Sequence, residues 1–245
     1  MDRFSYKNVY NSEKHKKFMD SKRYVIDDEF LYKAGNCELS EGFSVEYSIY
    51  SDTEQKDKQY SITKAVASKI ILKNADKKVY EYYCFNSYSC GFNDIIHHKN
   101  GHRYYAFHVD LYGISYLDVD TLEVYNYIPE GYKHNDDRMC GESFLIYDVH
   151  YDIKSNLIAY YGTYLGMAYD VMVGDFSDPL NFNPYLVSFS DAFNNKYDVY
   201  YDELGFKEWK NNRLYVLCYD DNKEKSLSAD ELGSMIDELT ERKNL

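Results

Sequence analysis

The feature that most limits the fold of this chain is a strand–turn–strand pattern that recurs after 45 residues. The segments "IILKNADKKVYEYYC" (70–84) and "ISYLDVDTLEVYNYI" (114–128) each contain an apolar strand, a polar turn and a second strand that ends in V-Y-x-Y. Asn and Asp favour such turns because their side chains bond the local backbone. Val79 and Val124 occupy the same place in the two copies, so the pattern predicts stacked units of blade size, for which ~40–45 residues is typical.

A longer repeat contains this pattern. Residues 93–121 and 147–179 share an Asp-led strand, a polar turn, a second strand, a Gly-containing connection and a third strand that ends in Asp. A shorter copy, "FKEWKNNRLYVLCYDD", covers 206–221. This order resembles the blade of a WD40-like β-propeller, with a D-x-K/N-x-N turn between two strands and a D-x-x-T/D turn before the outer strand. The segment "VGDFSDP" (173–179) stands where the Trp-Asp signature of that family would fall.

The resemblance extends over about residues 60–222 and implies a mainly β fold of antiparallel blade repeats, either a small closed β-propeller or a partial one. We expect a single propeller-like domain over 1–245, because one blade cannot bury both of its faces alone. Strands near 23–32 and 42–50 are also expected, but they fit no blade. The predicted blade-like units are 60–90, 91–132, 141–190 and 197–222.

The end of the chain departs from the β pattern. Ser228, followed three residues later by Glu231, has the form of a capping box. One apolar stripe at positions i, i+3, i+4 and i+7 is formed by Leu232, Met235, Ile236 and Leu239. An amphipathic C-terminal helix is therefore predicted over 229–243.

Charge limits the classes of partner. The chain carries 28 Lys and Arg against 41 Asp and Glu, a net charge of −13, which disfavours nucleic acid and anionic membranes. Residues 104–205 hold 17 acidic residues and 4 basic ones. Two interpretations stay open for this region: a solvated acidic surface, or a face for a basic protein partner. The 30 tyrosines favour strands and half-buried surfaces, where the ring packs while the hydroxyl stays wet.

The sequence begins without the apolar core of a secretory signal, and no stretch approaches the ~18 apolar residues that cross a bilayer. The cysteines are odd in number and include no C-x-x-C pair, so they indicate neither a disulfide framework nor a zinc knuckle. We therefore expect a cytoplasmic protein with reduced thiols. The five cysteines are Cys37, Cys84, Cys90, Cys140 and Cys218.

Ligand-type side chains alternate in "YDVHYDIKSNLIAYYG", where Asp148, His150 and Asp152 share one face of a predicted strand. His108 and Asp110 repeat the His-x-Asp spacing. Such residues can bind a divalent ion or transfer a proton. The blade comparison also explains Asp148 and Asp152 as strand-entry and turn residues, and alternation is typical of a half-buried strand. We prefer this second interpretation, expect no metal or cofactor, and keep the five residues as the candidate binding site.

Other motifs indicate little chemistry. "HHKNGH" (97–102) has the Lys-Asn-Gly centre of a hairpin tip, so we expect His97, His98 and His102 to point to solvent, and a zinc site there lacks a fourth ligand. An EF-hand-like spacing over 220–231 lacks the glycine at position six and follows a strand. No GxGxxG, GxxxxGK[ST], HExxH or GxSxG motif occurs in the sequence.

These observations predict a non-enzymatic, cytoplasmic protein-interaction module of bacterial type, with an acidic, Tyr-rich propeller surface that binds or inhibits a basic protein partner, as an immunity-type protein does. The alternative is a ligand-binding or hydrolytic propeller. Its site at the blade mouth would comprise His108, Asp110, Asp148 and His150. A third reading is a structural subunit of a homo-oligomer with unpaired blade edges.

Overall fold

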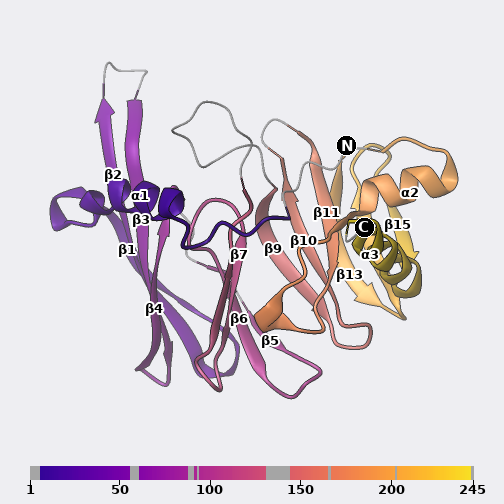
Figure 1. Ribbon diagram of the computed structural model, residues 1–245, viewed down its shortest axis with the longest axis horizontal. Helices are drawn as coiled ribbons and strands as arrows, with labels where there is room; N and C mark the ends of the chain where they lie inside the picture. Colours follow the sequence, from indigo (N-terminus) through magenta and orange to yellow (C-terminus); the bar gives the residue numbers. More distant parts are fainter. Residues whose placement is uncertain are drawn as a thin grey trace. The chain divides into compact units, whose positions relative to one another are not determined.

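The structure is a computed structural model that describes residues 6–55, 61–87, 91–92, 94–130, 144–164, 167–201 and 203–243 (Figure 1). The fold is mainly β with antiparallel sheets, as predicted. Helices among these residues are α1 (Glu13–Lys22), α2 (Phe189–Tyr197) and α3 (Ala229–Lys243), with short 3₁₀ turns between the strands. Cys90 and Cys140 lie outside the described residues, whereas Cys37 is exposed and Cys84 and Cys218 are buried.

The strands form four sheets, and each sheet is a meander in which strands consecutive in sequence pair side by side. The first sheet contains β1 (Leu31–Glu38), β2 (Phe43–Gln55), β3 (Ser61–Asn74) and β4 (Lys77–Phe85). The second contains β5 (Ile95–His97), β6 (Arg103–Phe107), β7 (Ile114–Asp118) and β8 (Val124–Tyr127). The third contains β9 (Leu145–Asp152), β10 (Leu157–Thr163), β11 (Tyr169–Asp175) and β12 (Val187–Ser188). The fourth contains β13 (Leu204–Lys210), β14 (Arg213–Cys218) and β15 (Lys223–Ser228).

The chain divides into two compact units. The N-terminal unit takes 7–96 and 103–141, with β1–β4, most of β5 and β6–β8. The C-terminal unit takes 1–6, 97–102 and 142–245, with β9–β15, α2 and α3. Counted over the sequence, the C-terminal unit holds 20 Asp and Glu against 11 Lys and Arg, which is −9 of the net −13. The acidic character of the chain is therefore concentrated in this unit.

The four sheets match the predicted blade-like units in part. The units predicted at 91–132 and 141–190 contain the complete second and third sheets. The unit predicted at 60–90 contains only β3 and β4, because the first sheet begins at Leu31. The unit predicted at 197–222 ends before β15. One propeller-like domain over the whole chain stays a prediction.

The strand predicted near 23–32 is wrong for most of its length. Two 3₁₀ turns, Arg23–Val25 and Asp28–Phe30, occupy it, and β1 starts only at Leu31. Asp27 caps the second turn by accepting the Glu29 N–H at 3.2 Å, a local bond that competes with extended backbone. The sequence pattern does not predict the preceding helix α1, because nearly all faces of this helix are polar and only His15 is buried.

The predicted turns are present. Ala75 and Asp76 between β3 and β4, and Asn211 and Asn212 between β13 and β14, have positive φ, the conformation that tight hairpins require. Asp118 closes the turn after β7 by accepting the N–H groups of the second and third residues that follow it, at 2.9 and 3.1 Å. These local bonds explain why the Asx positions were readable from the sequence.

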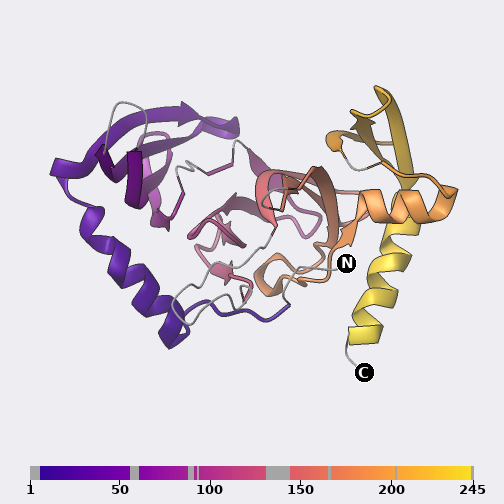
Figure 2. The ribbon, with the colours of Figure 1, turned by 90° about the horizontal axis from the view of Figure 1, so that it is seen from above.

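The predicted C-terminal helix is confirmed as α3. Ser228 Oγ accepts the Glu231 N–H at 3.3 Å, and the Glu231 carboxylate accepts the Ser228 N–H at 3.0 Å, which completes the capping box. Leu232 and Ile236 are buried in a core shared with β10, β11, α2 and the fourth sheet. Lys196 at the end of α2 pairs with Glu231, and Figure 2 shows α3 beginning beside α2. None of the helices in the described ranges is long and apolar enough to cross a bilayer.

Candidate functional site

The five residues of the predicted site do not fall within one unit. Asp148, His150 and Asp152 lie on β9 in the C-terminal unit. His108 and Asp110 lie in the N-terminal unit, in the connection that follows β6. The two groups are therefore two separate arrangements, and each has its own partners.

The Asp148 carboxylate and the His150 imidazole are in close contact on β9. The His150 Nε2 atom lies 3.1 Å from Asp148 Oδ2, and the two side chains are 28% and 49% exposed. The imidazole stacks flat on Phe206 of β13, with 3.5 Å between the ring centroids. Burial alone would raise the pKa of Asp148, but the hydrogen bond and charge of His150 outweigh it and hold this pKa below its usual range. Asp148 therefore stays ionised at neutral pH, and solvent can reach both side chains of the pair.

Asp152 has the turn role that the blade comparison predicts. Its Oδ2 atom accepts both the N–H of Ser155, at 3.0 Å, and its hydroxyl, at 2.7 Å. The alternating residues of β9 therefore divide into one carboxylate–imidazole pair and one turn-forming carboxylate.

Trp209 is a partner of β9 that the sequence did not reveal. It lies on β13. Its indole N–H donates to the carbonyl oxygen of His150 at 3.1 Å. Both Phe206 and Trp209 thus hold the strand segment that carries His150.

Replacing His150 separates its packing role from its chemistry. We expect His150→Ala to cost about 1 kcal/mol, because it removes the stack on Phe206. His150→Phe keeps a flat ring at this position and should remain within about 0.5 kcal/mol of the wild type. Urea unfolding of the three proteins checks this. Equal losses for the Ala and Phe variants would show that the imidazole nitrogens, not the stack, stabilise the strand.

His108 and Asp110 are buried, at 6% and 4% exposure. The His108 Nδ1 atom lies 3.0 Å from the Gly113 carbonyl oxygen. Asp110 accepts the Leu111 N–H at 2.6 Å, and burial raises the pKa of its carboxyl to about 7. Both side chains are thus enclosed within the N-terminal unit.

The histidines of the hairpin tip differ from expectation at one position. His98 is buried, not solvent-facing, and its Nε2 atom lies 2.8 Å from the Phe176 carbonyl oxygen. Its ring also stacks on Tyr151, with 5.2 Å between centroids. Packing against the C-terminal unit's own strands overrides the tendency of a turn to expose its side chains.

The EF-hand-like spacing has a structural explanation. Glu224 lies on β15 and forms an ion pair with Lys207 of β13. Ser228 and Glu231 are occupied by the capping box of α3. These side chains serve strand pairing and helix capping instead of converging on a cation.

Four tyrosines gather on the C-terminal unit, and we call them the tyrosine patch: Tyr147, Tyr161, Tyr169 and Tyr219. The centroids of Tyr161 and Tyr169 are 5.5 Å apart in a stacked arrangement, and those of Tyr147 and Tyr169 are 6.0 Å apart. Tyr147, Tyr169 and Tyr219 are 52%, 38% and 49% exposed. The rings come from three neighbouring strands and the turn after β14, so segments distant in sequence build one surface.

The backbone aims these rings. Tyr147 is the extra residue at a bulge, because Tyr161 pairs with Asp148 while Gly162 pairs with Ile146. Bulges commonly redirect a side chain in this way. Tyr219 is held beside β13 by a backbone bond from its N–H to the Glu203 carbonyl, at 2.9 Å.

Glycine is required at one point beneath the patch. A Cβ at Gly205 would lie 2.4 Å from the Tyr219 hydroxyl oxygen, so only glycine lets that ring lie flat across β13.

Carboxylates border the patch. Asp148 lies directly across from Tyr161 in the strand register, and Glu203 is exposed beside Tyr219. Burial, with smaller effects from Tyr219, Tyr169 and Glu203, raises the pKa of Tyr161. Burial also raises the pKa of Tyr147. The phenols of Tyr147 and Tyr161 therefore remain neutral over the physiological range, and the carboxylates supply negative charge at the border.

The sequence could have predicted one part of the tyrosine patch, the pairing of Tyr161 with Asp148. The turn at 153–156 places Tyr161 across from Asp148 by counting outward along both strands. Tyr219 lies after β14 of the fourth sheet, and no local sequence pattern predicts that it lies near the tyrosines of the third sheet. Comparison with known proteins finds no family model and no curated protein that matches the chain.

Proposed function

We propose that this protein is a non-enzymatic recognition protein, in which the tyrosine patch with Asp148 and Glu203 binds a basic protein partner. The observation that carries the proposal is the gathering of four tyrosine rings, three of them well exposed, beside two carboxylates. A contiguous exposed aromatic surface typically marks an interaction site. Tyrosine is enriched in such sites because it supplies large contact area at low cost in conformational entropy.

Charge selects the partner. The unit that carries the patch has a net charge of −9, with 11 basic against 20 acidic residues. A Lys or Arg over an exposed tyrosine ring gains about 0.5–1 kcal/mol. The chain already uses this contact internally, because Lys225 Nζ lies 4.2 Å from the ring centroid of Tyr201. The overall negative charge would further speed the approach of a basic partner.

The same proposal includes the blade arrangement. Each sheet is a short antiparallel meander, the form that propeller blades take. Propellers present rigid surfaces for recognition, and an inhibitory or immunity-type role against a basic protein is the form of recognition that fits the charge best. The strand edges that such blades expose are also where a homo-oligomer would form.

An octa-arginine peptide, acetylated and amidated, is the probe for this proposal. We expect saturable binding that weakens at least threefold between about 50 and about 300 mM NaCl, because screening shortens the reach of exposed charges. The double variant Tyr147→Ala/Tyr169→Ala should lose about tenfold in affinity by calorimetry, since each ring contributes a cation–π contact. Asp148→Asn/Glu203→Gln should lose a similar factor and flatten the salt dependence.

Tyr32→Ala is the matched control, because Tyr32 is 69% exposed on β1 of the other unit. It should bind the peptide as the wild type does. An equal loss in Tyr32→Ala, or the same affinity at both salt concentrations, would overturn the proposal. Binding of an octa-glutamate peptide with comparable affinity would also overturn it.

One observation favours a second candidate function, hydrolysis. The 3.1 Å contact between Asp148 and His150 has the geometry of a carboxylate that orients an imidazole for proton transfer. His150→Phe discriminates between the two functions. A recognition protein should keep its affinity for octa-arginine in this variant, whereas a hydrolase would lose its turnover of ester substrates.

A further inference from the structure

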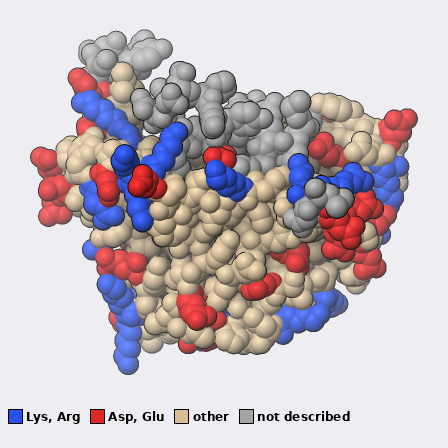
Figure 3. Space-filling view, viewed as in Figure 1, with Lys and Arg blue, Asp and Glu red and all other residues tan. Residues whose placement is uncertain are grey.

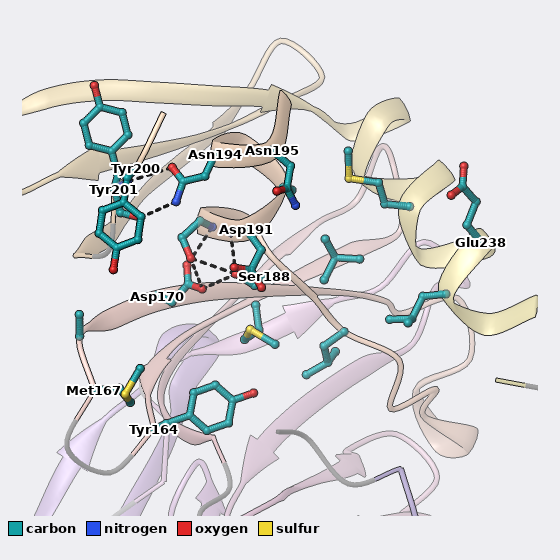
Figure 4. Close-up of a pocket in the computed structure, with 18 of the residues that line it drawn as sticks. Tyr164, Met167, Asp170, Ser188, Asp191, Asn194, Asn195, Tyr200, Tyr201 and Glu238 are labelled. Carbon is teal, nitrogen blue, oxygen red and sulfur yellow. Dashed lines mark hydrogen bonds between the residues drawn. The ribbon is translucent and has the colours of Figure 1, made fainter. Parts of the chain in front are cut away.

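A second concave site lies in the C-terminal unit, lined by residues that do not belong to the tyrosine patch. A cleft of about 680 Å³ opens between β11, α2 and α3 (Figure 4). This volume is within the ~300–1,000 Å³ that small-molecule sites usually have. Its lining combines an apolar floor with acidic and aromatic walls.

The floor is apolar and adaptable. It comprises Met172 of β11, Leu186 before β12, and Met235 and Leu239 of α3. Methionine has an unbranched, polarizable side chain that adjusts to ligands of different shape. A hydrocarbon or aromatic group of a ligand would therefore gain free energy by burying its apolar surface against these side chains.

Asp170 forms the inner acidic wall. Its Oδ2 atom accepts the hydroxyls of Ser188 and Ser190, at 2.6 and 2.8 Å. Its Oδ1 atom accepts the N–H groups of Val171 and Ser190, at 2.8 and 3.2 Å. All four donors are neutral, and burial raises the pKa of this carboxyl. The carboxylate is thus held rigidly and lacks a countercharge among these contacts.

The remaining charges leave the cleft negative. Asp191 is exposed in the first turn of α2, and its carboxylate makes no hydrogen bond or ion pair with the residues that the structure describes. Glu238 pairs with Arg242 at 3.2 Å, which neutralises the cation of the lining. Figure 3 shows acidic side chains gathered around α3.

The cleft is not an anion site, although the N-terminus of α2 borders it. Ser188 caps the helix by accepting the Asp191 N–H at 3.0 Å, and the Ser190 N–H is taken by Asp170. The amides that an anion would need are already occupied by the chain's own oxygens.

Aromatic side chains stand at the mouth of the cleft. Asn194 holds the segment after α2 in place, since its amide donates to the Tyr201 carbonyl at 2.8 Å and accepts the Tyr201 N–H at 3.0 Å. Tyr200 and Tyr201 thereby stay beside Asp170 and Ser188, as Figure 4 shows. Tyrosine faces attract organic cations. Lys225 already lies over the ring of Tyr201, so the exposed ring of Tyr200 is the one that can attract a ligand cation.

We infer that this cleft binds an amphiphilic organic cation, with its ammonium group toward Asp170 and Asp191 and its apolar body on the floor of Met172 and Met235. The inference does not rest on the proposed partner binding, because it uses other residues. It assigns a small-molecule ligand to a unit that also has a protein-binding surface.

Three isosteric probes test the charge of the ligand: 1-naphthylmethylamine, 1-naphthalenemethanol and 1-naphthoate. We expect saturable binding of the amine at pH 7 by calorimetry, at least about tenfold weaker binding of the alcohol, and no binding of the carboxylate. Equal affinity for amine and alcohol, or preference for the carboxylate, would overturn the inference. Absence of saturable amine binding would overturn it as well.

Two variants locate the amine in the cleft. Asp191→Asn removes the accessible carboxylate and should weaken amine binding about fivefold. Asn195→Lys adds an ammonium at an exposed lining position and should abolish it. Asp237→Asn is the control, because it removes the same charge from α3 outside the lining and should change nothing. If Asp237→Asn weakened amine binding as much as Asp191→Asn does, the effect would come from the net charge of the protein, and the assignment to the cleft would be overturned.

The two proposed sites can fail separately. Asp191→Asn should leave octa-arginine binding at the tyrosine patch unchanged. Tyr147→Ala should leave amine binding unchanged.

Discussion

Replacing Asp110 with Asn is expected to remove a loss of stability that the wild-type protein suffers as the pH rises from 3.8 to about 7. Asp110 is 4% exposed in the N-terminal unit, and the hydrogen bonds from Leu111 and Asn86 do not compensate for the burial of its charge. The imidazole of His15 on α1 faces this carboxyl, with its Nε2 atom 3.8 Å from Asp110 Oδ2.

His15 does not supply the missing charge at neutral pH. The imidazole is 2% exposed, and burial lowers its pKa below 6.5. Its Nδ1 atom accepts the Asn11 N–H at 3.4 Å, so the neutral ring carries its proton on Nε2, for which the described part of the chain offers no hydrogen-bond partner. A neutral imidazole thus faces a carboxyl that resists ionisation.

The sign of the pH effect follows from the two pKa values of Asp110. In the unfolded chain this carboxyl titrates near 3.8, and in the folded protein near 7, so the folded state holds the proton more tightly. Its contribution to stability is complete below pH 3.8 and is lost as the pH rises through about 7. A shift of this size corresponds to about 4 kcal/mol, at ~1.36 kcal/mol per pKa unit.

Two measurements check this prediction. The carboxyl ¹³C resonance that disappears in Asp110→Asn should titrate in the wild type with a midpoint near 7. The free energy of unfolding of the wild type minus that of Asp110→Asn should fall steadily as the pH rises toward 7, and then stay level. Both proteins also contain His15, whose lowered pKa costs stability as the pH falls below 6.5. A constant difference across this range would show that Asp110 ionises normally.

Local chemistry explains which parts of the fold were predictable. The hairpin turns depend on Asn and Asp side chains that bond their own backbone, and the capping box of α3 depends on Ser228 and Glu231 alone. Such features need no tertiary partner, so a single sequence reveals them. Helix α1 has no apolar stripe, and its one buried residue, His15, is polar. Its position depends on contacts that the sequence pattern does not encode.

The candidate site was predictable only along one strand. The alternation of Asp148, His150 and Asp152 correctly indicated a strand, and Asp152 has its predicted turn role. The stack of His150 on Phe206 joins two sheets about 56 residues apart in sequence. Tyr219 reaches the tyrosine patch by the same kind of nonlocal pairing. The periodicity of the sequence shows which residues share one face of a strand. It does not show which other sheet packs against that face.

Two Gly→Ala substitutions are expected to change stability in opposite directions. Gly162 lies on β10 next to the bulge that aims Tyr147. A Cβ at Gly162 would lie 1.9 Å from the Leu145 carbonyl oxygen and 2.8 Å from a ring carbon of Phe144. The closer atom belongs to the backbone of β9, so it moves only if the two strands separate. We expect Gly162→Ala to cost about 3 kcal/mol or more.

Gly233 is the matched control, in the interior of α3. A Cβ there would meet nothing within 4 Å, and Ala restricts the unfolded chain more than Gly does. Gly233→Ala should therefore stabilise the protein by about 0.5–1 kcal/mol. Urea unfolding measures both effects, and a Gly162→Ala variant within about 0.5 kcal/mol of the wild type would contradict the close strand approach. Because Tyr147 depends on that approach, Gly162→Ala should also lose octa-arginine binding, whereas Gly233→Ala should keep it. If the proposed recognition is correct, the strand geometry at Gly162 controls it from outside the tyrosine patch.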